Sequence, residues 1–415
     1  MNLLNIKGQI NYNSQKITNN LRSLLSIFKF INMLLKNGKI FYKGKFADLD
    51  IEIDDETGKI LKIERIDEIS AGNKGGKILN LSKKLIIPGA IDAHVHFRDF
   101  EQAYKEDFLS GSKAAVNGGI TRVFEMPNSK PKADCLRVIA SKIKKNPDIV
   151  NMHFYGGVSD EDFENNAKQI EKFIVCYKFY MYEDKNFVAL EKLNKKISFH
   201  AELNNKDDSV RNEINAVSHI AEISDKFKFK PHICHISTSE GLKIAKEKNW
   251  TVEVTPHNLL LDKSKDIRFN VRPPLRDERE RMKLVRNLNA IDVIASDHAP
   301  HSEKEKENGA NGFSGIETLL PLMLNLVNKG VLTLEQLIEK ICINPAKIFE
   351  MNNEILLNEK ANLTVIDLKK EWKIKGDNFY SKSKFTPFEG WKVIGKATDV
   401  VVNGRLVMED EILNV

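Results

Sequence analysis

Short apolar runs alternate with amphipathic segments along the middle of the chain. The runs that read as strands are 85–96, 120–126, 150–156, 174–181, 197–202, 231–236, 251–255 and 291–297. Apolar residues recur at the spacing of one helix face in the segments 105–116, 136–144, 210–226 and 278–288. Eight strands that alternate with helices predict an α/β fold, a (β/α)8 barrel of the TIM type over about 85–360.

Both ends of the barrel segment are flanked by a different pattern. Strand-like stretches separated by turn residues fill 33–84, and strands return over 361–415 with Asn403-Gly404 as a turn. We expect these two stretches to form one small β-sandwich beside the barrel. Helical runs at 315–329, 333–342 and 345–351 complete the barrel segment.

Residues 1–32 carry no regular pattern and are rich in Asn, Ser and Lys. An apolar stretch at 23–35 is too short to span a bilayer and is interrupted by Lys29 and Asn32. It has no small-residue cleavage signal. We expect residues 1–32 to be dispensable or disordered, as an upstream start assigned in error would be. An amphipathic targeting or contact helix is the alternative.

The composition narrows the class of protein. Hydrophobic residues make up 41% and charged residues 29%, which is typical of a soluble globular protein and predicts no membrane partner. The net charge of +6 is spread over 64 basic and 58 acidic residues without a long basic block, so no nucleic-acid partner is expected. Four cysteines lie far apart without a C-x-x-C pair, which favours the reducing cytoplasm over a disulfide framework.

His94, His96 and Arg98 lie at positions i, i+2 and i+4, after the apolar run Leu85–Ala90 that begins the first predicted barrel strand. Because side chains alternate across a strand, all three point to one face. Imidazole is a favoured zinc ligand, and the planar guanidinium of arginine suits a carboxylate. The segment predicts a metal hydrolase that acts on an anion; a chance H-x-H in a loop is the alternative.

Polar residues also close the later strands, where the chemistry of such barrels lies. These residues are Asn128, His200, His235, His257 and Asp297. Lys178 lies inside the apolar run Cys-Tyr-Lys-Phe-Tyr-Met. Burial disfavours an ammonium group, so Lys178 is either neutralised or held in a structural salt bridge.

Several motifs together resemble a known family. They are HVHFRD (94–99), KEDFLSGSKAAVNGGIT (105–121), MPN (126–128), HIST (235–238), TPHNLLL (255–261), RPPLR (272–276), SDHAPH (296–301) and GIET (315–318). In this order they resemble the dihydroorotase family of the amidohydrolase superfamily, from about Met33 to the C-terminus. The resemblance implies a zinc-dependent hydrolase that interconverts N-carbamoyl-L-aspartate and dihydroorotate in pyrimidine biosynthesis.

The resemblance also implies a site for two Zn²⁺ ions. The expected ligands are His94, His96, Lys178, His200, His235 and Asp297. Lys178, carboxylated on its side-chain nitrogen, would bridge the two ions, and Asp184 is the alternative ligand if Lys178 is unmodified. Asp297 would also act as the catalytic acid and base. Carboxylation would answer the cost of burying Lys178, because it turns a cation into an anionic ligand.

Substrate-binding residues of the family match further positions. The expected set is Arg98, Asn128, His301, Gly315 and Arg272. The first three would bind the substrate carboxylate, and the backbone of Gly315 would meet the pyrimidine ring. Asn128 has a competing interpretation, in which it caps a helix expected after Pro131.

The chain departs from the family pattern at several points. Arg272 stands where bacterial relatives often have a substrate-contacting asparagine, which puts that contact in doubt. Asn258 replaces the second histidine of a common T-P-H-H motif, and Phe100 and Glu101 replace a usual Pro-Gly pair. The Lys- and Glu-rich segment 302–308 is expected to be a solvated loop, with an active-site lid as the alternative.

Two other functions compete with this interpretation. Hydantoinases, dihydropyrimidinases and allantoinases share the metals and the lysine, but they do not need an arginine at the position of Arg98. A non-catalytic scaffold paralogue would be expected to lose metal ligands, and all six are present here. A homodimer is common in the family, although no interface is evident in the sequence.

Overall fold

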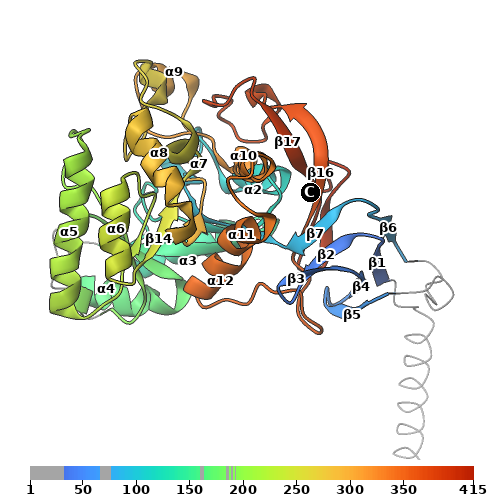
Figure 1. The fold of residues 1–415 in the computed structure, drawn as a ribbon. Helices are drawn as coiled ribbons and strands as arrows, with labels where there is room; N and C mark the ends of the chain where they lie inside the picture. The colour runs from blue at the N-terminus through green and yellow to red at the C-terminus, as the bar shows by residue number, and fades with distance from the viewer. Residues whose placement is uncertain (1–31, 66–75, 159–162, 184–186, 188–189, 192) are drawn as a thin grey trace, which may run out of the picture.

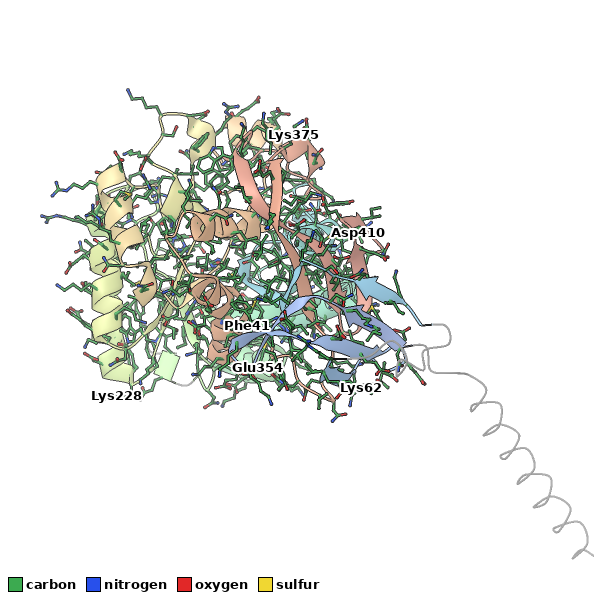
Figure 2. The ribbon with its side chains drawn as sticks, turned by 45° about the vertical axis from the view of Figure 1, so that its right-hand side comes forward. Phe41, Lys62, Lys228, Glu354, Lys375 and Asp410 are labelled. Carbon is green, nitrogen blue, oxygen red and sulfur yellow. The ribbon has the colours of Figure 1, made fainter. Side chains whose placement is uncertain are left out.

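A computed structural model of the chain describes residues 32–65, 76–158, 163–183, 187, 190–191 and 193–415. The predictions for residues 1–31 and for Asp184 lie outside these residues. Strands from both chain ends lie together on one side of the molecule, away from the helices α4 to α6 (Figure 1). Lys62 and Lys228 mark these opposite sides (Figure 2). Within the described ranges, no helix has the length and apolar character needed to cross a membrane.

The middle of the chain forms the predicted barrel. Its eight strands follow one another in chain order, and each neighbouring pair is parallel. They are β8 (Ala90–Val95), β9 (Ile120–Glu125), β10 (Asn151–Gly157), β11 (Cys176–Tyr180), β12 (Ile197–His200), β13 (His232–Ile233), β14 (Thr251–Val254) and β15 (Val293–Ile294). A parallel bridge between Val95 and His298 brings the last strand's continuation back to the first. The (β/α)8 prediction is confirmed.

Helices surround the strands. They are α2 (Phe108–Asn117), α3 (Leu136–Lys145), α4 (Phe163–Ile170), α5 (Val210–Phe227), α6 (Ser239–Glu247), α7 (Pro256–Leu260), α8 (Glu278–Arg286), α9 (Glu303–Glu307), α10 (Ile316–Asn328), α11 (Leu334–Ile338) and α12 (Asn344–Ile348). The segment 302–308, predicted as a loop, contains the short helix α9. Ser302 and Glu305 form a capping box that satisfies its first backbone N–H groups.

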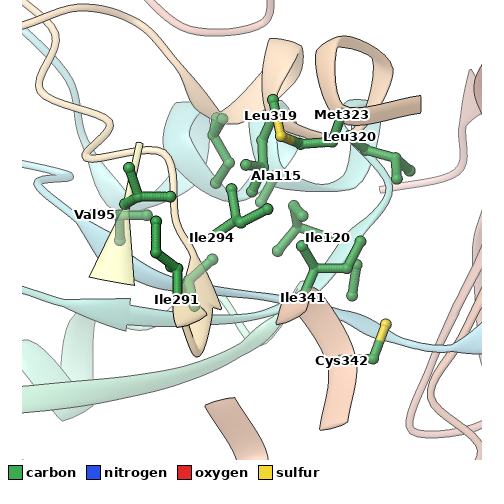
Figure 3. Close-up of a cluster of buried hydrophobic side chains, with 14 of the residues drawn as sticks. Val95, Ala115, Ile120, Ile291, Ile294, Leu319, Leu320, Met323, Ile341 and Cys342 are labelled. Atoms are coloured by element: carbon green, nitrogen blue, oxygen red, sulfur yellow. The ribbon is translucent and has the colours of Figure 1, made fainter. Parts of the chain in front are cut away.

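Apolar side chains from the strands and the covering helices form one continuous core. Figure 3 shows Val95, Ile120 and Ile294 gathered with Leu319 and Met323 of α10. All five side chains are fully buried, and each contributes about 1.5–3 kcal/mol by leaving water. This core fixes the strand ends, from which the polar side chains of the site project.

The two chain ends form the predicted β-sandwich. One sheet has the order β5-β4-β1-β6 and the other the order β19-β18-β17-β16-β7-β2-β3. The strands are β1 (Asn32–Lys36), β2 (Lys39–Tyr42), β3 (Lys45–Asp48), β4 (Asp50–Asp54), β5 (Ile60–Glu64), β6 (Ile78–Asn80), β7 (Leu85–Pro88), β16 (Leu363–Lys373), β17 (Lys392–Val402), β18 (Arg405–Glu409) and β19 (Ile412–Leu413). Met33, Ile53 and Val401 share a second apolar cluster, which joins the two ends.

The predicted first barrel strand, 85–96, proves to be two strands in different sheets. β7 pairs with β2 and β16 of the sandwich, whereas β8 pairs with β9 of the barrel. The break falls at Gly89, where an added Cβ would lie 2.1 Å from Thr121 Oγ1. The barrel therefore begins with β8 rather than at residue 85.

Candidate metal centre and substrate pocket

His94, His96 and Asp297 meet at the carboxyl end of the barrel. Strand β8 directs both histidines to one face, as predicted, and Asp297 follows β15. Asp297 Oδ1 lies 3.1 Å from His96 Nε2 and 3.4 Å from His94 Nε2. The ligand atoms of the three residues all lie within 4.8 Å of one another. Tetrahedral zinc with bonds of about 2.0–2.1 Å places its ligand atoms roughly 3.3 Å apart, so this group can hold a metal ion.

His200 and His235 form a second group beside the first. His200 Nδ1 lies 3.1 Å from His235 Nε2. The ring centroids of His235 and His94 are 5.1 Å apart, so the two groups are neighbours. The structure thus brings together the five histidine and aspartate ligands that the sequence predicts.

Lys178 lies in the middle of β11 rather than at its end, and it is 0% exposed. Its Nζ has no hydrogen-bond partner, and the ring centroid of Tyr180 lies 5.4 Å away. No described carboxylate pairs with this ammonium, so the predicted alternative of a structural salt bridge is not found. A buried cation without a counter-ion is strongly unfavourable.

Burial favours the neutral form of His94, His96 and His235. Burial, together with the charge of Lys178, lowers the pKa of His94 to about 4. Burial also lowers the pKa of His96, and the charge of Arg98 lowers it further. Burial lowers the pKa of His235 as well, and His200 lowers it further. A neutral imidazole has a free lone pair, which is the form that binds a metal ion.

Glu253 of β14 connects the two groups. Its carboxylate lies 2.5 Å from His94 Nδ1 and accepts a hydrogen bond of 3.1 Å from the backbone N–H of His235. Burial alone would raise the pKa of Glu253, but His94 and His232 outweigh it and hold the pKa below its usual range. The sequence analysis missed this residue, although an acidic side chain inside the apolar run Thr-Val-Glu-Val was a signal.

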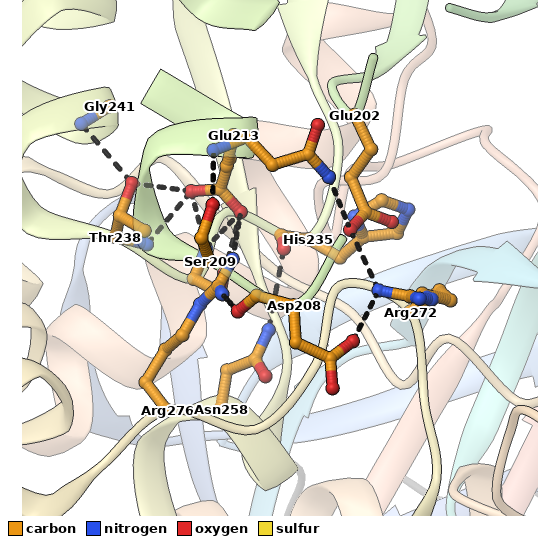
Figure 4. A network of polar contacts seen from close by, with 12 residues as sticks. Glu202, Asp208, Ser209, Glu213, His235, Thr238, Gly241, Asn258, Arg272 and Arg276 are labelled. Carbon is orange, nitrogen blue, oxygen red and sulfur yellow. Dashed lines mark hydrogen bonds and ion pairs between the residues drawn. The ribbon is translucent and has the colours of Figure 1, made fainter. Parts of the chain in front are cut away.

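Arg272 belongs to a polar network with Glu202 and Asp208 (Figure 4). Its Nη1 lies 3.3 Å from Glu202 Oε1 and 2.9 Å from Asp208 Oδ1. The other carboxylate oxygen of Glu202 lies 2.8 Å from His200 Nε2. Arg272 lines the pocket, but its charge is already shared between two carboxylates. Glu202, two residues after His200, was also missed from the sequence.

A pocket of about 330 Å³ opens above the histidines. Its wall includes Arg98, Asn128, Arg272 and His301, and also Gln102, Lys105 and Gly312, which the sequence did not single out. Arg98 is buried, its Nε has no hydrogen-bond partner, and no described carboxylate pairs with it. The pocket therefore combines a candidate metal centre with a cation that lacks a counter-ion.

Comparison with known proteins agrees with this arrangement. The model of the amidohydrolase family matches residues 85–407. A dihydroorotase from Pyrococcus horikoshii is 41% identical over 399 residues, which cover 90% of this chain and 91% of that protein. A dihydroorotase from Bacillus thuringiensis is 32% identical, with 92% of this chain and 99% of that protein covered. The chain belongs to the dihydroorotase family of amidohydrolases.

Solved structures with the same architecture include a hydantoinase and a dihydropyrimidinase. An L-hydantoinase from Arthrobacter aurescens has a TM-score of 0.84 at 25% identity, with 93% of this chain and 98% of that chain covered. A dihydropyrimidinase from Brevibacillus agri has a TM-score of 0.83 at 20% identity, with 92% and 96% covered, and shows the shared fold alone. The chain thus shares its fold with these two proteins.

Asn128 and Gly315, which have roles expected from the dihydroorotase family, and Asn258, which departs from the family pattern, make contacts that the sequence did not predict. Asn128 Oδ1 lies 2.6 Å from His96 Nδ1, and α3 begins only at Leu136, so Asn128 is not the cap of that helix. The backbone N–H of Gly315 donates to His298 Nδ1 at 3.2 Å, and the structure does not bring Gly315 into the pocket wall. Asn258 donates to the backbone oxygen of His235 at 3.3 Å, which helps to hold that ligand.

Proposed function

We propose that the chain hydrolyses the cyclic amide of dihydroorotate and, in the biosynthetic direction, closes N-carbamoyl-L-aspartate with loss of water. Dihydroorotases 32–41% identical to the chain over about nine tenths of its length support this activity. The observation that carries the choice of substrate is Arg98, a buried guanidinium without a carboxylate partner beside the His/Asp cluster. Dihydroorotate carries the carboxylate that this site lacks.

Two zinc ions fit the donor set. The first would be held by His94, His96 and Asp297, and the second by His200 and His235. Two buried nitrogens without hydrogen-bond partners, Lys178 Nζ and His235 Nδ1, support a group that the protein alone does not supply. When bound, divalent metals supply an activated water and a Lewis acid for the amide carbonyl.

We further propose that Lys178 is carboxylated. Its neutral amine would attack carbon dioxide, form an N–C bond and lose one proton, which leaves an anionic carbamate. The carbamate oxygens would bridge the two metal sites, and the buried charge would change from positive to negative. Asp184 remains the alternative ligand.

The chain's own side chains divide the remaining work. Asp297, which lines the pocket, would take the proton of the attacking water and pass it to the departing amide nitrogen. Arg98 and His301 would bind the substrate carboxylate, and Asn128 would hold His96 while its amide faces the pocket. Arg272 and Gly315 would act on the substrate only indirectly, because each holds a neighbouring segment of the chain in place.

We also propose a homodimer in the cytoplasm. The homodimer follows from the resemblance to the family. The cytoplasm is supported by the four cysteines, all of which are free thiols. Size-exclusion chromatography coupled to light scattering measures the mass in solution, and a monomer at micromolar concentration would contradict the first statement.

Replacing Arg98 tests the choice of substrate. Arg98→Met should lower kcat/KM for dihydroorotate by about 100-fold or more, because a buried carboxylate loses a charge-assisted bidentate partner. Arg137→Met, at an exposed position of α3, is the matched control and should have no effect. An unchanged kcat/KM in Arg98→Met would contradict the proposal.

A further inference from the structure

His301 lies between two cationic side chains at the pocket wall. Its Nδ1 is 3.3 Å from Lys105 Nζ, and its Nε2 is 3.2 Å from Arg98 Nη2. Nε2 also lies 2.9 Å from the backbone oxygen of Asn311. One ring nitrogen therefore faces a lysine, and the other faces both an arginine and a carbonyl oxygen.

Only one protonation state of His301 suits these contacts. A lysine ammonium can only donate, so Nδ1 must accept and carries no proton. Burial, followed by the charges of Arg98 and Lys105, lowers the pKa of His301 to about 3, so the ring is neutral at neutral pH. The single ring proton then lies on Nε2, where it donates to the oxygen of Asn311.

The proton on Nε2 places two donors side by side. Arg98 Nη2 and His301 Nε2 both carry hydrogen, so the 3.2 Å between them is not a hydrogen bond. Both side chains line the pocket. When a carboxylate binds, the Nε2 proton can be shared between it and the Asn311 oxygen, so that both side chains donate to one carboxylate group and the unfavourable approach of the two donors is relieved.

We propose that Lys105 is a positioning residue, which fixes His301 in the Nε2–H tautomer and so makes it a donor to the substrate carboxylate. The inference rests on the proposed function and deepens it, because it gives the cause of the donor role of His301. Lys105 is itself held, because Glu305 Oε1 lies 2.7 Å from its Nζ. Glu305 accepts further hydrogen bonds from Tyr104 and Ser302, which fix the carboxylate and with it the ammonium.

Removing Lys105 would favour the opposite tautomer. Glu305 Oε2 lies 3.6 Å from His301 Nδ1 and would accept a proton carried there after a small shift. Nε2 would then be a lone pair that accepts from Arg98. The substrate carboxylate would lose the His301 donor and would compete with His301 for Arg98.

Steady-state kinetics of the zinc-loaded full-length chain test this role. Lys105→Met should raise KM for dihydroorotate by about 10- to 100-fold, the cost of one or two hydrogen bonds to a charged group. The change in kcat should be smaller, because the carboxylate is held alike in the ground and transition states. Lys105→Arg keeps a donor and should restore most of the KM.

The matched control is Lys304→Met, which removes an exposed lysine of α9 outside the pocket. It should leave KM and kcat unchanged. A Lys105→Met variant indistinguishable from this control, or one that loses kcat with KM unchanged, would overturn the proposal.

The tautomer can be observed without turnover. In the chain labelled with ¹⁵N-histidine, the signals of His301 are identified by their loss in His301→Gln. We expect a neutral ring with the proton on Nε2, a shift toward the Nδ1–H form in Lys105→Met, and its reversal in Lys105→Arg. A wild-type ring protonated on Nδ1 would overturn the inference. A chain that does not open dihydroorotate would refute the proposed function and leave this measurement intact.

Discussion

Glu253 is the residue on which the geometry of both histidine groups depends. Its carboxylate accepts from His94, His232 and the backbone of His235 at once. A glutamine has one acceptor oxygen and one donor group, so it cannot replace all of these contacts. The position of His94, a proposed metal ligand, therefore depends on a residue that does not itself line the pocket.

We expect Glu253→Gln to weaken zinc binding by about 10- to 100-fold, as carboxylates that orient metal-binding histidines do elsewhere. Competition with a chromogenic chelator measures this affinity. Glu240→Gln, at an exposed position of α6, is the control. Equal zinc affinity in the two variants would show that Glu253 does not orient the site.

Lys178 offers a direct chemical test at the same scale. Because its buried Nζ has no partner, we expect a carbamate there in bicarbonate buffer. Protein equilibrated with ¹³C-bicarbonate should show one carbamate carbon signal by NMR, and Lys178→Met should lack it. The kcat of this variant should be at least about 100-fold lower than that of the wild type, which corresponds to a rise of about 2.7 kcal/mol in the activation free energy. Absence of the signal from the wild-type protein would contradict carboxylation and make Asp184 the candidate ligand.

Some residues of the site were predictable because they depend on regular geometry. Strand alternation places His94 and His96 on one face, and strand ends place Asp297 near them. The contacts of Asn128 and Gly315 depend on the path of irregular segments, which no periodicity encodes. The role of Lys105 was not predictable for another reason, because it depends on contact with His301, which is almost two hundred positions away in the sequence.

At the scale of elements, a buried acid joins the start of α10 to the C-terminal segment. Glu317 accepts hydrogen bonds from the backbone N–H groups of Tyr380 and Ser381 and from Asn117. Burial raises the pKa of Glu317 to about 7 from its usual 4.5. The folded chain therefore binds more protons here than the unfolded chain between these pH values.

Stability should follow from that difference with a definite sign. A raised acid pKa lowers the free energy of unfolding as pH rises from about 4.5 to 7, with little change above. Relative to the Glu317→Gln variant, the free energy of unfolding of the wild type should fall by about 2–3 kcal/mol between pH 5 and pH 8, because each pKa unit corresponds to about 1.4 kcal/mol. Urea unfolding of both proteins at the two pH values measures it. Parallel pH profiles would contradict the burial of a titrating carboxyl.

The elements themselves were largely predictable, because eight apolar runs and their intervening amphipathic segments carry clear periods. The exceptions have physical causes. Nothing in the apolar run 85–96 marks Gly89 as the point where the chain leaves one sheet for another, since the break depends on contact with Thr121. Helix α9 was not predicted because its polar composition is typical of a loop, although its capping-box residues can be recognised in the sequence.

For the whole molecule, the sandwich and the barrel form the unit that should suffice for activity. Strand β1 is the first described element; it begins at Asn32, which pairs with Asp54 of β4. A chain that starts at Met33 should keep kcat/KM for dihydroorotate within about two-fold, because the described contacts that it loses are those of Asn32 at the end of β1, which are worth about 1 kcal/mol of stability. Failure of this chain to fold would assign a structural role to the first residues.

The central claim is that a pocket that binds the substrate carboxylate lies beside a site for two metal ions. The most direct test is the turnover of dihydroorotate and of dihydrouracil, measured side by side with zinc-loaded protein in bicarbonate buffer. The two rings differ in the carboxylate that Arg98 would bind. Fast opening of dihydroorotate with little or no opening of dihydrouracil is the predicted result. Comparable or faster opening of dihydrouracil would contradict the account and place the enzyme among the other cyclic amidases.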